Sequence, residues 1–223
     1  MITVHHLNNS RSHRILWLLE ELALPYRITR YTRDPRTMFA PAELQKVHPL
    51  GKAPVISDGD VTMAESGAII EYLVTRHGNG LLQPTVGSPE WSQYIYWLHY
   101  AEGSAMPPLL LRLVADRLGG EQTPWLVRPM ARQIGLGLRR KLIDPQLDRH
   151  LSFMEDALSG REWFAGAQFT AADVQMSFPL EAAAARAGLD ARRPRLWNWL
   201  QRIHARPAYQ RALENGGAHE PLR

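Results

Sequence analysis

The first third of the chain mixes short apolar runs with apolar residues at helical spacing. Residues 2–7 alternate weakly and end at two asparagines, which predicts a strand. A helix with one buried face is predicted over residues 11–23 by apolar side chains three or four positions apart: Ile15, Leu18, Leu19 and Leu22. Residues 26–31 predict a second strand, and residues 42–47 predict one or two helical turns.

A hairpin and a third helix are predicted next. Val55 and Ile56 form a short apolar run directly after Pro54, and residues 61–63 form another. The Asp58-Gly59 pair between them is a turn signal, so the two runs predict a β-hairpin. A helix is predicted to begin near Glu65-Ser66. The predicted order of elements up to His77 is therefore βαβαββα.

The rest of the chain has a helical pattern. Residues 78–89 contain breakers and little periodicity, which predicts a linker. Helices are predicted over residues 90–118, with a break near Met106 before two prolines, and then over 124–141, 145–158 and 194–205. Thr170 and Asp173 have the spacing of a helix-capping box. The tail, residues 215–223, is predicted to have no regular structure.

Composition narrows the class of protein. The chain has 223 residues and a formal net charge of +4, and its basic residues are scattered, so we expect no nucleic-acid partner. It has no cysteine, which excludes disulfides and a protein thiolate. The N-terminus lacks the apolar core of a signal peptide, and no apolar run approaches the ~20 residues of a membrane span. We therefore expect a cytoplasmic protein without a membrane partner. The nine histidines lack metal-ligand spacing, so no metal site is expected.

Two positions suit chemistry with a small anionic ligand. Ser66 is predicted at a helix N-terminus, where free backbone amides and the helix dipole favour a carboxylate. Ser10 lies where a strand ends and a helix begins, so its hydroxyl is able to donate to a thiolate. On the residues alone, a capped helix without a ligand is an equal alternative for Ser66, and an ordinary N-cap role is the better interpretation of Ser10.

Two pairs of segments resemble a known family. The run Gly51-Lys52-Ala53-Pro54-Val55, followed by Ala64-Glu65-Ser66-Gly67-Ala68-Ile69, is similar to the glutathione-binding half of cytosolic glutathione S-transferases. Residues 9–14 and 16–22 resemble the first strand exit and first helix of serine-type, theta-like and bacterial members. The resemblance implies a thioredoxin-like α/β domain over residues 1–77, a linker over 78–89 and an all-α domain over 90–223.

The resemblance also implies roles for individual residues. Ser10 would stabilise the thiolate of glutathione, and Ser12 is its rival. Lys52 would hold the glycine carboxylate of glutathione, and Val55 would pair with the cysteinyl unit through its backbone. The γ-glutamyl end would be held by Glu65 at its ammonium group and by Ser66 at its carboxylate. Arg14 is interpreted as a buried structural ion-pair partner, and the alternative is a second contribution to the positive field at this site.

The function implied is transfer of glutathione, a co-substrate, to a small apolar electrophile by a homodimeric enzyme. The electrophile pocket is expected between the two domains. Its candidate lining residues are Tyr96, Tyr100, Met106, Leu110 and Trp163. Two alternatives stay open: a glutathione-dependent peroxidase or isomerase, and a regulatory protein that binds glutathione without turnover.

Overall fold

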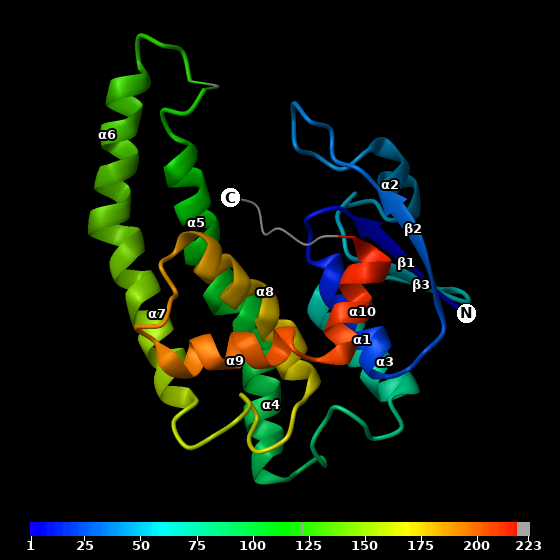
Figure 1. Ribbon diagram of the computed structural model, residues 1–223. Coiled ribbons are helices and arrows are strands. Elements are labelled where there is room, and N and C mark those ends of the chain that lie inside the picture. The colour runs from blue at the N-terminus through cyan, green and yellow to red at the C-terminus, as the bar shows by residue number, and fades with distance from the viewer. Residues whose placement is uncertain (122, 218–223) are drawn as a thin grey trace.

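The computed structural model describes residues 1–121 and 123–217. Its first part contains four strands and three helices in the predicted order (Figure 1). In chain order these are β1 (Ile2–Leu7), α1 (Ser12–Glu21), β2 (Tyr26–Tyr31), α2 (Ala42–Val47), β3 (Val55–Asp58), β4 (Val61–Ala64) and α3 (Ser66–His77). The βαβαββα prediction is therefore confirmed, with α1 shorter at both ends than the predicted 11–23.

The four strands form one mixed sheet in the order β2-β1-β3-β4. β1 runs parallel to β2 and antiparallel to β3, while β3 and β4 form the predicted hairpin. Val55 pairs with His5 on one side and with Ala64 on the other. Since β1 is a central strand, its C-terminal end and the start of α1 lie beside the entrance to β3. This topology brings residues from both ends of the first domain to one place.

The second part of the chain is helical. Its elements are α4 (Pro89–Tyr100), η1 (Ala101–Ala105), α5 (Met106–Arg117), α6 (Arg128–Leu138), η2 (Arg139–Ile143), α7 (Asp144–Ala157), α8 (Ala171–Arg186), α9 (Pro194–His204) and α10 (Pro207–Gly216). Figure 1 shows α5 and α6 side by side, extending well beyond α9. Together with the mixed sheet, these helices confirm the predicted class, an α/β part followed by an all-α part.

The predicted break near Met106 is a short π-helix. The segment η1 ends at Ala105, and α5 begins at Met106 with prolines in its first turn. A proline has no amide hydrogen, so it fits best where a helical hydrogen bond starts anew. The wider turn of η1 absorbs this change without ending the helix, and π-turns of this kind recur at functional sites.

Helix α8 lies at the centre of the helical part. Its capping box is present as predicted, because the Asp173 carboxylate accepts from the Thr170 amide at 3.0 Å and from its hydroxyl at 3.1 Å. The same carboxylate accepts from the Phe164 amide and the Trp199 indole N–H. Burial raises the pKa of Asp173 to about 6, and the four hydrogen bonds act against this rise.

The prediction for the C-terminal tail is wrong at its start. Asn215 and Gly216 belong to α10, a helix that was not among the predicted elements. The cause is tertiary: α10 packs on α1, and the Asn215 amide donates to Glu20 at 2.9 Å. Residues 218–223 of the predicted tail lie outside the described residues. Within the described part of the chain, every helix is too short or too polar to cross a bilayer.

Candidate functional site

A small cavity lies where the first domain meets η1. Its volume is about 190 Å³. The lining residues come from the start of α1, the entrance to β3, the start of α3 and η1: Arg11, Leu50, Lys52, Ala53, Pro54, Ala64, Glu65, Ser66 and Glu102. Three of the residues predicted for glutathione, Lys52, Glu65 and Ser66, are thus brought together here.

The floor of this cavity is the N-terminus of α3. Glu65 precedes the helix with a φ of 71°, a left-handed conformation that is rare for a residue with a side chain. Such a backbone persists where surrounding structure imposes it, and these positions cluster at ligand sites. Ser66 begins the helix and is buried, while the Glu65 side chain is exposed. The amides of the first helical turn, which have no carbonyl partner within a helix, therefore face a site that suits an anion.

Arg14 supports this helix start from beneath. Its side chain is 1% exposed, and one terminal nitrogen donates to the Ser66 hydroxyl oxygen at 3.0 Å. The other donates to the backbone carbonyl of Gln175 in α8 at 2.6 Å. Because Arg14 occupies a lone pair of the Ser66 oxygen, the Ser66 hydroxyl hydrogen is left to donate to a ligand. Arg14 is structural, as predicted, and it also orients a predicted binding residue.

Glu102 balances the charge of Arg14. Its carboxylate forms an ion pair with Arg14, and it accepts from Arg11 Nε at 3.1 Å. Burial alone would raise the pKa of Glu102, but Arg14 and Arg11 hold this pKa below its usual range. Burial lowers the pKa of Arg14, and Glu102 opposes that shift. The three residues thus form a charged junction between α1 and η1.

Ser10 and Ser12 are buried residues on either side of Arg11, which lines the cavity. The chain turns sharply between β1 and α1, with Asn9 in the left-handed region at φ 48°. The Ser10 hydroxyl oxygen accepts from the Ser12 amide at 3.2 Å and lies 2.7 Å from the Ser12 hydroxyl oxygen. Ser10 thus caps an amide of the first turn, as its alternative interpretation holds, although Arg11 is the N-cap residue. Ser12 is fully buried, and its hydroxyl is engaged by His6 and by the backbone of Leu7.

Lys52 and Val55 flank the cis peptide bond between Ala53 and Pro54. Lys52 is exposed at the rim of the cavity, where its ammonium is free to reach an anion. The Val55 side chain is buried in the core, so any contact with a ligand would have to come from its backbone. Neither Ser10 nor Val55 is among the residues that line the cavity itself.

Sequence reasoning missed Arg11 and Glu102 as parts of the site. Arg11 lies inside the segment that resembles the family, but an arginine beside a predicted helix start is a common surface residue. Glu102 lies in a segment predicted as a long helix, about ninety residues away from α1 in the chain. A charged residue beside a predicted helix break is a weak signal, and nothing local indicates its partners. The contact between α1 and η1 depends on how the first domain packs against the helical part of the chain.

The five residues predicted for the electrophile pocket do not gather in one cavity. Tyr100, Met106 and Trp163 are buried core side chains. Leu110 is exposed on α5, and Tyr96 lines a hollow beside Phe153 on α7. The aromatic residues at helical spacing on α4 therefore mainly indicate a face that packs in the core, as apolar stripes on helices usually do, and not a ligand pocket.

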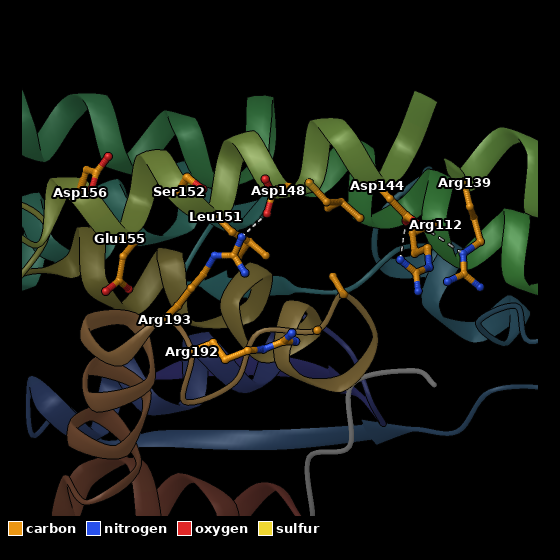
Figure 2. Close-up of a pocket in the computed structure, with 13 residues that line it drawn as sticks. Arg112, Arg139, Asp144, Asp148, Leu151, Ser152, Glu155, Asp156, Arg192 and Arg193 are labelled. Carbon is orange, nitrogen blue, oxygen red and sulfur yellow. Dashed lines mark hydrogen bonds and ion pairs between the residues drawn. The ribbon is translucent and has the colours of Figure 1, made fainter. Parts of the chain in front are cut away.

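A larger hollow of about 680 Å³ lies among η2, α7 and the segment before α9 (Figure 2). Figure 2 shows arginines and carboxylates facing each other across it, with Arg193 on Asp148 and Arg112 on Asp144. Several of its charges pair with one another, and some are widely exposed, such as Arg192 at 80% and Asp148 at 73%. Among the residues that the structure describes, no three histidines or carboxylates gather as metal ligands.

Comparisons with known proteins agree with the geometry. The family model for the glutathione S-transferase N-terminal domain matches residues 10–76, and that for the C-terminal domain matches residues 139–202. Glutathione S-transferase 3 of Schizosaccharomyces pombe is 39% identical, with 96% of this chain and 87% of the relative covered. A disulfide-bond oxidoreductase of Escherichia coli is 26% identical, with 96% and 94% covered. A glutathione S-transferase structure from Actinobacillus pleuropneumoniae superposes with a TM-score of 0.81 at 36% identity, covering 98% and 94% of the two chains.

Proposed function

This chain belongs to the glutathione S-transferase family, and from that premise we propose that it joins the glutathione thiolate to a small apolar electrophile. The observation that carries the proposal is the cavity shared by Lys52, Glu65 and Ser66, with Arg14 holding the Ser66 oxygen at 3.0 Å. A peptide with a carboxylate at each end and one ammonium group matches this set of charges.

The tripeptide would lie across the cavity with its γ-glutamyl end on α3. Its carboxylate accepts from the Ser66 hydroxyl and from the first amides of α3, and its ammonium faces Glu65. Lys52 attracts the glycine carboxylate from the rim. The cysteinyl unit pairs with the backbone of Val55, like a strand added to the sheet. This arrangement directs the sulfur toward the start of α1.

Ser10 would then stabilise the sulfur anion. A hydroxyl that donates to a thiolate favours the ionised form and so lowers the pKa of the thiol. The protein has no cysteine, so the attacking sulfur is supplied by glutathione. The thiolate forms the new carbon–sulfur bond, the leaving group departs with its electron pair, and the thiol proton passes to solvent. The protein contributes orientation and a higher population of thiolate.

The proposal is tested by conjugation of glutathione to a chromogenic halonitrobenzene. We expect turnover by the wild type and a loss of about tenfold to a hundredfold in kcat/KM for Ser10→Ala, since a hydrogen bond to a charged group contributes ~1.5–3 kcal/mol. Calorimetry with glutathione should show that this variant still binds. Wild-type protein that neither binds nor conjugates glutathione would overturn the proposal, while binding without turnover would indicate the regulatory alternative.

The second candidate is glutathione-dependent disulfide reduction, favoured by the similarity to the oxidoreductase of Escherichia coli. In that reaction one glutathione thiolate attacks the substrate disulfide, forming a mixed disulfide and releasing one thiolate. A second glutathione releases the other, so that two glutathiones are oxidised to one glutathione disulfide. Reduction of hydroxyethyl disulfide, measured beside conjugation, separates the two activities because the conjugation reaction produces no glutathione disulfide.

We also propose a homodimer. Tyr96 on α4 and Phe153 on α7 are exposed neighbours, with ring centroids 6.2 Å apart, and together they form an aromatic surface shared by these two helices. Exposed aromatic groups of this kind are enriched at protein interfaces. Sedimentation at micromolar concentration should give twice the 25.3 kDa of one chain, and a single-chain mass would overturn this proposal.

A further inference from the structure

Three buried side chains form a continuous hydrogen-bonded line from β1 to the start of α1. His6 Nδ1 lies 2.9 Å from the Ser12 hydroxyl oxygen, which lies 2.7 Å from the Ser10 hydroxyl oxygen. His6, Ser12 and Ser10 are all buried. His6 and Ser12 do not line the cavity, so neither has a role in the arrangement proposed so far.

The direction of this line decides what Ser10 is able to do. A hydroxyl has one hydrogen to donate and two lone pairs that accept. One lone pair of Ser10 is occupied by the Ser12 amide at 3.2 Å. If the Ser12 hydroxyl also donates to Ser10, both lone pairs are filled and the Ser10 hydrogen is left for the ligand. If the line runs the other way, the Ser10 hydrogen is consumed by Ser12.

For the Ser12 hydroxyl to donate to Ser10, both lone pairs of the Ser12 oxygen must accept from other groups, and its surroundings provide two donors. Its oxygen accepts from the Leu7 amide at 3.3 Å, which fills one lone pair. The second lone pair is filled when His6 carries its hydrogen on Nδ1 and donates to Ser12. Ser12 then has its own hydrogen to donate, and the Ser10 oxygen at 2.7 Å is a nearer acceptor than the Leu7 carbonyl at 3.3 Å. A sulfur anion beside Ser10 accepts and does not donate, so it selects this direction of the line.

We propose that His6 and Ser12 are positioning residues, which aim the Ser10 hydroxyl hydrogen at the sulfur of glutathione. This inference rests on the proposed function of Ser10. No proton is transferred along the line: two hydroxyl groups rotate, and His6 holds its hydrogen on Nδ1. In this proposal Ser10 is the serine that contacts the sulfur, and Ser12 acts through Ser10.

The test measures the pKa of the bound glutathione thiol from its ultraviolet thiolate absorbance. In Ser12→Ala we expect that pKa to rise toward the value of free glutathione and kcat to fall about threefold to tenfold, the effect of one hydrogen bond. The affinity for glutathione measured by calorimetry should not change. Ser177→Ala is the matched control, since it removes a buried hydroxyl bonded to Val174 in α8 and should leave the thiol pKa unchanged.

Variants of His6 make the test independent of how well Ser12→Ala folds. His6→Asn places a carboxamide N–H near the position of Nδ1 and should keep most of the activity. His6→Leu has no donor there and should behave like Ser12→Ala. A wild-type thiol pKa in both Ser12→Ala and His6→Leu would overturn the proposal.

A double variant separates this inference from the proposed function. Because Ser12 acts through Ser10, the variant carrying both Ser10→Ala and Ser12→Ala should be no slower than Ser10→Ala alone. If the two losses multiply, Ser12 acts on the sulfur independently and the inference fails while the role of Ser10 stands. If Ser10→Ala alone leaves the thiol pKa unchanged, the proposed role of Ser10 fails and this inference with it.

Discussion

The two charged hollows of this protein differ in a way that cavity size does not reveal. The hollow of Figure 2 has more than three times the volume of the cavity at α3, yet Arg112 and Arg193 there pair with neighbouring carboxylates that are partly or widely exposed. The smaller cavity lies over a helix N-terminus, and its support includes the buried Arg14 and Ser66. Burial makes each of these interactions stronger and more dependent on its partner. The smaller cavity is therefore the better candidate for ligand chemistry.

The largest expected effect follows from removing the buried cation. Arg14→Met leaves the Gln175 carbonyl without its arginine donor and leaves Glu102 with Arg11 as its remaining ion-pair partner. We expect the free energy of unfolding to fall by about 3–5 kcal/mol, the usual cost of breaking a buried ion pair from one side. Urea denaturation measures this. Arg192→Met, in the exposed hollow, is the matched control. A similar fall in its free energy of unfolding would contradict the view that the charges at the smaller cavity are the more tightly coupled.

A smaller effect is expected from removing the hydroxyl at the helix start. Ser66→Ala should weaken glutathione binding about tenfold to a hundredfold, because a hydrogen bond to a carboxylate contributes ~1.5–3 kcal/mol. Calorimetric titration with glutathione measures the change. Ser152→Ala, in the large hollow, should bind like the wild type. Unchanged affinity in Ser66→Ala would contradict the proposed position of the γ-glutamyl group at the start of α3.

Acidification should weaken the contribution of Glu102, beside the smaller cavity, to the free energy of unfolding. The pKa of Glu102 in the folded protein is below its ordinary value of 4.5, so the stability that its ionisation contributes is fully present above pH 4.5 and is lost as the pH falls through the folded pKa. Glu102→Gln should be less stable than the wild type at neutral pH, and this gap should narrow on acidification. Denaturant titrations from about pH 7 to about pH 3 measure the gap. A gap that does not change with pH would contradict the proposed ionic role of Glu102.

The smallest effect is expected in the large hollow. Arg193 pairs with Asp148, whose side chain is 73% exposed. A double-mutant cycle with Arg193→Ala and Asp148→Ala should give a coupling energy below about 1 kcal/mol, as for other solvent-exposed ion pairs. A coupling of several kcal/mol would show that this hollow is organised as tightly as the cavity at α3.

Much of the first domain was predictable because its signals are local. The hairpin turn at Asp58-Gly59, the strand at 26–31 and the short helix at 42–47 were each indicated by a few adjacent residues. The serine at the start of α3 was indicated in the same way. Helix α10 was not predicted, although Ala208, Tyr209 and Ala212 have helical spacing; the structure shows that this face packs against α1.

By itself the sequence determined the order of the first seven elements, the family resemblance and the polar residues at two helix starts. Tertiary structure alone decided that Arg14 donates to Ser66, that Glu102 from η1 forms an ion pair with Arg14, and that His6 lies within hydrogen-bond distance of Ser12. The physical reason is distance along the chain: caps and turns depend on near neighbours, whereas a buried charge needs partners that only the packing of remote segments provides.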